Sequence, residues 1–309
     1  MSLSLDGYLI VRSFDELICI FDNIRNGLAI VGAIYTTSAV IRLLRRIIYI
    51  TRVYAIPKLF YSSDLSLKYG GKWAVVTGAS EGIGRSYARK LAQRKLNVLL
   101  ICKNTDKLLL VAEEISLDYN VQTKCISMEL VNLSEDSFYS FVENTLNEID
   151  VGILVNNVGT NDINLFACYG RKPHQQLIDI NIKSIVLLTH IVLPQMVKRK
   201  AGAIVNIFSL ISNLPFPYLT LYFASKSFID SFSKLLQIEN ACHNIYIQSL
   251  QPGFKCSLPL QNSRLSRFFV VDPDTFCESA IKTLGTTHST HGYWKYGAME
   301  YLNDFFGVF

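Results

Sequence analysis

A tyrosine and a lysine stand four residues apart in the sequence YFASK, where Tyr222 and Lys226 would share one face of a helix. A free phenol has a pKa of about 10, and a neighbouring ammonium favours its ionised form, so we expect the pKa of Tyr222 to move toward neutrality. Reduction of a ketone needs such an acid at the carbonyl oxygen and a hydride donor at the carbonyl carbon. The same spacing occurs at Tyr54 and Lys58, but Pro57 interrupts any regular helical face there. We therefore assign the proton donor to Tyr222.

Two further polar residues precede this pair and could complete an active site. Asn181 lies in the middle of a predicted helix, and Ser209 follows a predicted strand, thirteen residues before Tyr222. A serine hydroxyl can hydrogen-bond a substrate carbonyl, and an asparagine can order a water that relays protons to solvent. The lysine can also hold the ribose hydroxyls of a nucleotide cofactor. The sequence therefore predicts a catalytic set of Asn181, Ser209, Tyr222 and Lys226.

The segment WAVVTGASEGIGRSYARK, residues 73–90, has the pattern of a turn that binds a diphosphate. An apolar run suited to a buried strand is followed by three glycines and then by helix-forming residues. Glycine lets a diphosphate approach the backbone, and the free N–H groups and positive dipole at the start of the next helix attract it. Because glycine-rich turns often serve only to reverse the chain, this pattern depends on the residues that follow. The predicted cofactor contacts in this turn are Gly78, Ser80, Glu81, Gly82, Ile83 and Gly84.

Two positions at the ends of other strands bear on the same cofactor. Asn156 begins the sequence NNVG at a strand exit, where amide side chains and a glycine can close a sheet over a cofactor. Lys103 stands at the end of the second strand, where a NAD-selective site would have an aspartate to bind the ribose 2′-hydroxyl. A cation suits a 2′-phosphate instead, so the sequence favours NADP(H). If Lys103 were an ordinary solvated lysine, the cofactor preference would stay open.

The elements that must position these residues alternate along the chain from Lys72 onward. Strand-like runs cover 73–76, 98–101, 124–127, 152–155, 203–208 and 245–250, and helical segments cover 84–94, 106–119, 134–147, 174–198 and 222–242. This alternation predicts right-handed crossovers and a parallel sheet that is covered on both faces. We therefore expect an α/β Rossmann-type fold, a doubly wound parallel sheet in a three-layer αβα arrangement, with its ligand site at the C-terminal ends of the strands.

Residues 1–65 differ from the rest, and we assign them to an N-terminal membrane-associated helical segment, which leaves 66–309 as the catalytic domain. The run from Asn26 to Ile41 is uncharged, and several arginines follow it. As a helix its sixteen residues reach about 24 Å, short of the roughly 30 Å hydrocarbon core, so spanning requires snorkelling arginines or a locally thinner bilayer. A helix lying in the interface and a hairpin buried on the main domain are the alternatives. If the run spans, the arginines on its C-terminal side place the catalytic domain in the cytosol.

Composition narrows the possible partners. The 309 residues carry a formal net charge of +5 without a basic block interleaved with aromatics, so nucleic acid is not an expected partner. Half of the residues are hydrophobic and the mean hydropathy is +0.26, which suits a membrane protein. The seven cysteines include no CxxC pair and indicate reduced thiols, and His288 and His291 have no neighbouring ligand cluster, so no metal site is predicted.

Together, the segments TGASEGIG and NNVG with Asn181, Ser209, Tyr222 and Lys226 resemble the cofactor fingerprint and catalytic tetrad of the short-chain dehydrogenase/reductase family, over residues 70–295. Segments such as KWAVVTGASEGIGRSYA and VLPQMVKRKAGAIVNI are similar to the family's membrane-associated branch. This branch includes 17β-hydroxysteroid dehydrogenases, very-long-chain 3-oxoacyl-CoA reductases and hydroxysteroid dehydrogenase-like proteins. Vertebrate members of the last group have phenylalanine in place of the catalytic tyrosine, whereas this chain keeps Tyr222.

The resemblance implies further cofactor contacts at Glu129, Pro252, Gly253 and Ser257. Glu129 stands where the family usually has aspartate, and Ser257 stands where it has threonine. Lys255 replaces a valine near the nicotinamide, and this charge leaves open an alternative, a catalytically weak or inactive relative that acts as a binding or scaffold module.

The resemblance and the apolar N-terminus together imply an NADPH-dependent oxidoreductase of the membrane. Its expected substrate is a lipid-like ketone of the hydroxysteroid or 3-oxoacyl-CoA type, which it reduces to the alcohol. A homodimer is implied by the resemblance alone. The expected location is the endoplasmic reticulum membrane with the catalytic domain facing the cytosol, and the alternative is the mitochondrion.

Overall fold

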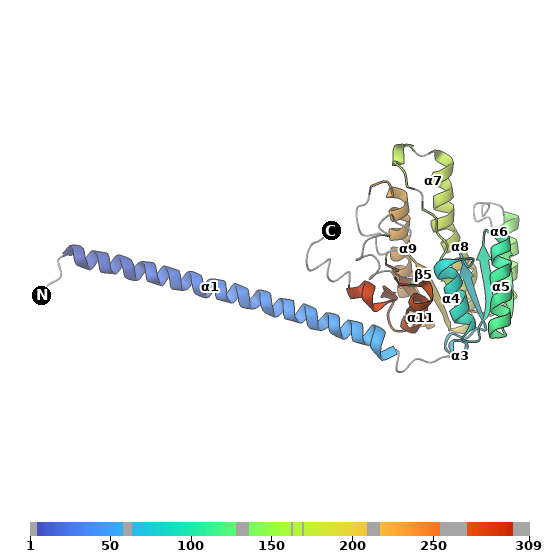
Figure 1. The fold of residues 1–309 in the computed structure, drawn as a ribbon, viewed down its shortest axis with the longest axis horizontal. Coiled ribbons are helices and arrows are strands. Elements are labelled where there is room, and N and C mark those ends of the chain that lie inside the picture. Colours follow the sequence, from blue (N-terminus) through green and yellow to red (C-terminus); the bar gives the residue numbers. More distant parts are fainter. Residues whose placement is uncertain are drawn as a thin grey trace. The chain divides into compact units, whose positions relative to one another are not determined.

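The computed structural model describes residues 5–57, 64–127, 136–161, 163–168, 170–208, 217–253 and 271–298. The chain divides into two compact units, Met1–Arg52 and Val53–Phe309. Among its described residues, the second unit contains a sheet of seven strands, all paired in parallel. Figure 1 shows this sheet and its helices as a ribbon. Because the residue range of this unit includes all four predicted catalytic residues, we call it the catalytic unit.

The sheet has the strand order β3-β2-β1-β4-β5-β6-β7. Its strands are β1 (Trp73–Thr77), β2 (Asn97–Cys102), β3 (Thr123–Ser127), β4 (Val151–Asn156), β5 (Gly202–Ile207), β6 (Ile245–Leu250) and β7 (Ser289–Thr290). The first six confirm the predicted strands to within about two residues, and β7 was not predicted. Since the chain runs outward from β1 in one direction and then returns to β4 beside it, the switch point of the topology lies between β1 and β4.

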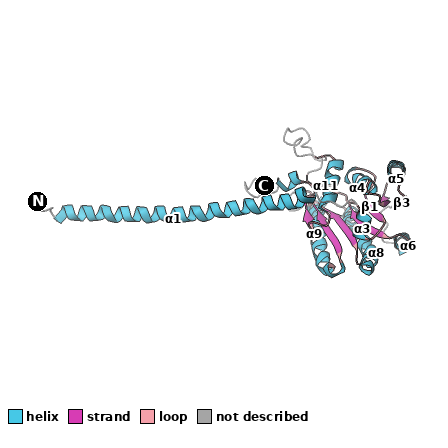
Figure 2. Ribbon diagram, turned by 90° about the horizontal axis from the view of Figure 1, so that it is seen from below, coloured by secondary structure: helices cyan, strands magenta, loops and turns pink. Residues whose placement is uncertain are grey.

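Helices cover both faces of the sheet, which confirms the three-layer arrangement (Figure 2). One face is covered by α4 (Gly82–Ala92), α5 (Thr105–Tyr119) and α11 (Pro273–Thr283), whose apolar side chains form one core cluster with the strands. The other face is covered by α6 (Asp136–Asn147), α8 (Ser184–Arg199) and α9 (Thr220–Glu239). The strands read as continuous apolar runs because both of their faces are buried.

Local sequence fixes several helix ends. The side chain of Asn104 accepts a hydrogen bond from the Lys107 backbone N–H, 3.0 Å, and so caps the start of α5. Asn120 ends the same helix in the left-handed conformation with φ +52°. The catalytic unit also contains four short helical elements: α3 (Leu65–Tyr69), α7 (Arg171–Ile178), and two 3-10 turns, η3 (Phe166–Cys168) and η6 (Ala241–His243).

The helix predicted over 174–198 is interrupted by a π-helical turn. This turn, η4 (Asp179–Lys183), separates α7 from α8 and contains Asn181. A π-turn accommodates one extra residue without ending the helix, and such turns are frequent at functional sites. The regular helical pattern of the sequence gave no indication of it.

The described residues of the N-terminal unit, 5–52, form one long helix. Helix α1 (Leu5–Ile50) continues into the π-helical turn η1 (Thr51–Ala55). At 100° per residue, the exposed side chains of Leu28, Ile30, Val31 and Val40 point to all sides of α1. The segment Ile24–Ala55 is long and apolar enough to cross a membrane, as is 171–199 in the catalytic unit, which is partly buried in that unit's core.

The two compact units divide between Arg52 and Val53, and Val53 and Tyr54 are only 2% and 5% exposed. The boundary near residue 65 between a membrane-associated segment and a catalytic domain stays a prediction. The Tyr54 hydroxyl lies 3.0 Å from Oγ1 of Thr290 in β7.

Candidate active site

The turn after β1 has the geometry of a phosphate cradle. Gly78 adopts φ +63°, and a Cβ atom at Gly84 would overlap the carbonyl oxygen of Gly78. The side chain of Asn157 donates to the carbonyl oxygens of Thr77 and Gly78, at 3.0 and 3.2 Å, and so holds the turn against the end of β4. Glu81 precedes α4 without a side-chain cap, so the first N–H groups of that helix are directed at the space over the turn.

The two asparagines of NNVG have different roles. Asn156 is fully buried, and its Nδ2 donates to Oδ1 of Asn206 in β5 at 2.8 Å. Its side chain therefore ties β4 to β5 inside the sheet. Asn157, which the sequence reasoning did not single out, is the amide that faces the turn. The NNVG motif indicated amide side chains at this strand end, but the sequence does not show which of the two asparagines faces the glycine turn and which lies inside the sheet.

Asn181 links the loop after β4 to helix α9. Its Oδ1 accepts from the backbone N–H of Thr160 at 2.8 Å, and its Nδ2 donates to the Thr160 carbonyl at 2.9 Å and to Oγ of Ser225 at 3.1 Å. Both polar atoms of this fully buried amide are thus bonded within the protein. A water relay at this position would therefore use the backbone carbonyl of Asn181, not its side chain.

Tyr222 and Lys226 lie in the first two turns of α9, as predicted. Lys226 is only 4% exposed, and its Nζ lies 5.6 Å from the centroid of the Tyr222 ring. A Cβ atom at Gly159 would lie 2.9 Å from the same Nζ and 3.6 Å from Oδ1 of Asn181. Val158, next to Gly159, has its Cα atom 3.3 Å from the position that a Cβ atom of Gly78 would take. The loop after β4 therefore contacts the glycine turn on one side and the Lys226 ammonium on the other, at the switch point of the sheet.

Three of the four predicted catalytic residues are therefore brought together: Asn181, Tyr222 and Lys226. The fourth, Ser209, lies outside the described residues. The same holds for Glu129, Lys255 and Ser257.

The electrostatics of Tyr222 differ from the sequence-based expectation. Burial raises the pKa of the Tyr222 phenol above its ordinary value, whereas proximity to the lysine predicts a lower one. The physical reason is desolvation, since a phenolate loses more hydration on burial than a neutral phenol does. Tyr222 is therefore protonated at neutral pH in the cofactor-free protein, which is the form that donates a proton.

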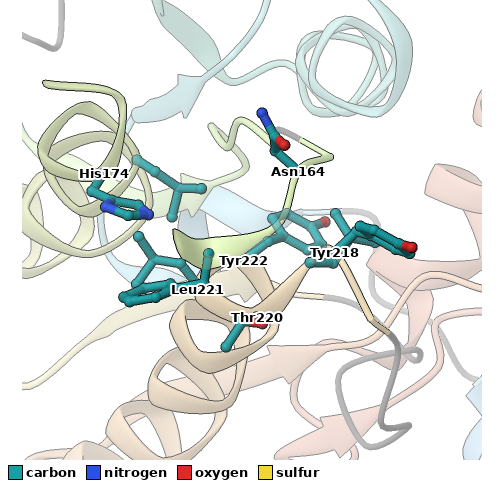
Figure 3. A pocket seen from close by; sticks show the side chains of 9 residues that line it. Asn164, His174, Tyr218, Thr220, Leu221 and Tyr222 are labelled. Atoms are coloured by element: carbon teal, nitrogen blue, oxygen red, sulfur yellow. The ribbon is translucent and has the colours of Figure 1, made fainter. Parts of the chain in front are cut away.

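A pocket opens beside Tyr222, lined also by Asn164, Phe166, His174, Leu177 and Tyr218. In Figure 3 the Tyr222 side chain lies between His174 and Tyr218. Phe166 stacks on His174 with ring centroids 4.6 Å apart. Tyr218 has φ +69°, and its carbonyl accepts from the Asn164 N–H at 3.0 Å. These lining residues were not predicted, because they follow no motif and become neighbours only through the fold.

The end of β2 forms the other border of the glycine turn. Sγ of Cys102 lies 3.0 Å from Oγ of Ser80, and Lys103 follows with an exposed side chain. Lys107, in the first turn of α5, forms an ion pair of 3.2 Å with Glu81. Two lysines thus flank this end of the turn, of which the sequence indicated only Lys103.

Pro252 and Gly253 follow the end of β6, on the other side of the switch point. The Tyr296 ring packs directly on Gly253, where a Cβ atom would overlap it. The backbone N–H of Gln251 donates to the carbonyl of Thr290 in β7, 2.8 Å, which anchors the start of this turn.

Comparison with known proteins agrees with this geometry. Residues 72–263 match the short chain dehydrogenase family model. The chain is 39% identical over 280 residues to the human "Inactive hydroxysteroid dehydrogenase-like protein 1", covering 87% of this chain and 82% of the relative. It is 39% identical over 227 residues to the human "Very-long-chain 3-oxoacyl-CoA reductase", covering 72% of each.

Among solved structures, a metagenomic short-chain oxidoreductase in complex with NADP is similar, with a TM-score of 0.60 and 26% identity over 71% of this chain and 96% of that one. The parallel sheet, the glycine turn and the matched residues lead to one conclusion: the chain belongs to the short-chain dehydrogenase family of oxidoreductases.

Proposed function

We propose that the protein is an NADP(H)-dependent oxidoreductase that reduces a lipid-like ketone to the corresponding alcohol. The observation that carries this proposal is the meeting of Tyr222, Lys226 and Asn181 next to the glycine turn. A proton donor, a cation and a phosphate cradle around one point are what hydride reduction of a carbonyl requires.

The residues present fit a dinucleotide, because Gly78 and Gly84 carry no Cβ atom that would clash with Asn157 and with the Gly78 backbone, so the turn can close tightly, and α4 begins without a side-chain cap. The turn from Gly78 to Gly84 would hold the diphosphate, Lys226 the nicotinamide ribose, and Pro252 and Gly253 would border the nicotinamide. When bound, the cofactor supplies the hydride. Glu129 and Ser257 stay predicted contacts to the adenine and the nicotinamide.

A preference for NADP(H) over NAD(H) is supported by charge at the end of β2. Lys103 is exposed there, and Lys107 lies near it in the first turn of α5, paired with Glu81. The solvent-exposed pair of Lys107 and Glu81 contributes at most about 1 kcal/mol, so a 2′-phosphate can compete for this lysine. The related metagenomic oxidoreductase was solved with NADP bound.

In the proposed reaction, Tyr222 protonates the carbonyl oxygen. Its raised pKa keeps the phenol protonated at neutral pH, which suits the direction of reduction. Lys226 returns a proton to the Tyr222 phenolate and regains one from an ordered water, which the backbone carbonyl of Asn181 would hold by accepting its hydrogen bond. Ser209 orients the substrate carbonyl.

The proposed substrate class is supported by the pocket and by α1. The pocket beside Tyr222 is lined mostly by aromatic and aliphatic side chains, including Phe166, Leu177 and Tyr218, which suits an apolar substrate. The apolar side chains of α1 point to all sides, which favours a spanning helix over an interfacial one. We propose a steroid or long-chain 3-oxoacyl thioester taken up at the endoplasmic reticulum membrane, with the catalytic unit in the cytosol.

The test is NADPH consumption by the full-length protein over a panel of steroid ketones and 3-oxoacyl-CoA thioesters. We expect Tyr222→Phe to abolish turnover while NADPH binding, followed by tryptophan fluorescence, stays nearly intact. Tyr218→Phe is the matched control, since it removes a phenol from the same pocket and should retain turnover. Wild-type turnover no faster than that of Tyr222→Phe on every ketone would contradict the proposal.

A second candidate function is a binding module without turnover. It is favoured by the similarity to the human "Inactive hydroxysteroid dehydrogenase-like protein 1", at 39% identity. Under this alternative the protein binds NADPH and a lipid ketone without consuming either. Isothermal titration of NADPH together with the turnover assay separates the two functions.

A further inference from the structure

The chain enters the catalytic unit through a buried tyrosine. Val53 and Tyr54 follow Arg52 directly, and their side chains are almost fully buried. The Tyr54 hydroxyl lies 3.0 Å from Oγ1 of Thr290, which is itself only 2% exposed. The catalytic unit therefore begins with buried residues, directly after Arg52 in the sequence.

Tyr54 contacts a strand residue that is bonded to the turn of Pro252 and Gly253, which would border the nicotinamide. Thr290 pairs with Leu250 at the end of β6, and its carbonyl accepts from the Gln251 N–H. Pro252 and Gly253 follow at once, and Tyr296 packs on Gly253. Tyr54 is thus connected to this turn through a single residue, Thr290, which contacts Tyr54 and bonds to Gln251, the residue before Pro252.

The surface next to Tyr54 has the composition of a membrane-facing surface. A Cβ atom at Gly297 would lie 3.7 Å from the Tyr54 hydroxyl, so this glycine is a direct neighbour. One helical turn before it, Trp294 is 41% exposed, and its ring lies 6.1 Å from that of Tyr293. Lys295 adjoins both in sequence. Tryptophan, tyrosine and lysine are the side chains that concentrate at lipid headgroups.

Chain length sets how far this surface can be from a bilayer. Eleven residues, 42–52, separate the uncharged run from Val53, and they are helical throughout. At 1.5 Å per residue they span about 16 Å, of which a headgroup layer takes roughly 5–8 Å. Apolar residues within this segment, such as Ile47 and Ile48, let it enter the bilayer further.

We propose that the surface formed by Tyr293, Trp294 and Lys295, beside the buried Tyr54, rests on phospholipid headgroups, so that the Pro252–Gly253 side of the active site is held at the membrane surface. This proposal depends on the spanning role of α1 given under the proposed function. A substrate dissolved in the bilayer would then enter the site without crossing bulk water.

The full-length protein in phospholipid vesicles tests the proposal through its two tryptophans. Trp73 lies at the start of β1 and is only 7% exposed, so it serves as the internal reference. We expect a lipid with a nitroxide on its headgroup to quench most of the Trp294 emission in Trp73→Phe, and to leave the emission of Trp294→Phe unchanged. Subtracting the quenching of Trp294→Phe from that of the wild type gives the quenching of Trp294 without a substitution in the core at Trp73.

Vesicle flotation of the same samples separates two failures. Protein that floats with the vesicles but whose Trp294 is not quenched overturns the docking, while the membrane anchor stands. Protein that does not float overturns the anchor itself. Tyr54→Ala should reduce quenching of Trp294 without loss of flotation, whereas Leu67→Ala, at a position 83% exposed on the catalytic unit, should change neither.

Discussion

Gly159 leaves the space that the ammonium of Lys226 occupies: a Cβ atom on this glycine would lie 2.9 Å from Nζ. The backbone of Gly159 is not in the left-handed region, so alanine is conformationally allowed there. The atom that must move is the end of a flexible side chain. Gly159→Ala therefore displaces the ammonium at little cost in folding free energy.

We expect Gly159→Ala to lower kcat/KM for ketone reduction by about ten- to a hundredfold. The displaced Lys226 ammonium would lose its proposed charge-assisted hydrogen bond to the nicotinamide ribose, and such a bond is worth roughly 1.5–3 kcal/mol. The free energy of unfolding should change by less than about 1 kcal/mol. Gly170→Ala is the control, since its Cβ atom would meet its nearest neighbour, Pro173, at an ordinary 3.7 Å. Loss of activity in proportion to loss of stability would show that Gly159 has only a structural role.

The parallel sheet and the catalytic spacing were predictable because both depend on local patterns. Apolar runs of strand length alternate with helical segments, and a tyrosine and a lysine four residues apart share a helix face wherever that helix lies. The glycines after β1 were predictable for the same reason, since their role is in the backbone of one turn.

What the sequence could not supply depends on long-range contacts. Pro57 excludes Tyr54 as a catalytic tyrosine, but nothing in the sequence indicates that its hydroxyl lies 3.0 Å from Oγ1 of Thr290, 236 residues further along the chain. Strand β7 is two residues long and exists only through its pairing with β6. The direction of the Tyr222 pKa shift follows from burial, which an i to i+4 lysine spacing does not reveal.

Cofactor choice should depend on Lys103. We expect Lys103→Ala to weaken NADPH binding by about tenfold, since it removes one charged contact to the 2′-phosphate at an exposed site, and to leave NADH binding unchanged. Lys107→Ala should have a smaller effect of the same kind, because Glu81 already engages that lysine. Both dissociation constants are measured by isothermal titration at fixed ionic strength.

Lys124→Ala serves as the control for charge alone, since Lys124 lies in β3 near Trp73, which begins β1 at the opposite end from the glycine turn. An equal loss of NADPH and NADH affinity in Lys103→Ala would mean that this lysine makes no contact specific to the 2′-phosphate.

The raised pKa of Tyr222 determines the pH dependence of the two reaction directions. Reduction uses the protonated phenol, and burial extends the pH range in which this form dominates. The rate of ketone reduction should therefore stay level through neutral pH and fall only above about pH 10, while alcohol oxidation, which needs the phenolate, should rise over that range. Profiles of kcat/KM against pH report the free enzyme. A reduction rate that falls with a midpoint near pH 7 would show that Lys226 outweighs burial.

Asp272 should stabilise the catalytic unit in a pH-dependent way. It caps α11, and its Oδ1 accepts from the backbone N–H groups of Asp274 and Thr275, both at 3.0 Å. The hydrogen bonds from Thr275, by its side chain and its backbone, lower the pKa of the Asp272 carboxyl. A carboxyl with a lowered pKa stabilises the fold above its unfolded pKa of about 4, and this contribution is lost as the pH falls through the lower folded value.

We therefore expect Asp272→Ala to reduce the free energy of unfolding by about 0.5–2 kcal/mol at neutral pH. Asp272→Asn is the matched variant, because asparagine keeps an oxygen that can accept the same hydrogen bonds but carries no charge, and it should lose less. The difference between wild type and Asp272→Asn should shrink as the pH falls below about 4, since protonation then removes the wild-type charge as well. Urea denaturation at several pH values measures this difference, and a difference that stays constant with pH would mean that the charge of Asp272 makes no contribution and that only its hydrogen bonds hold the start of α11.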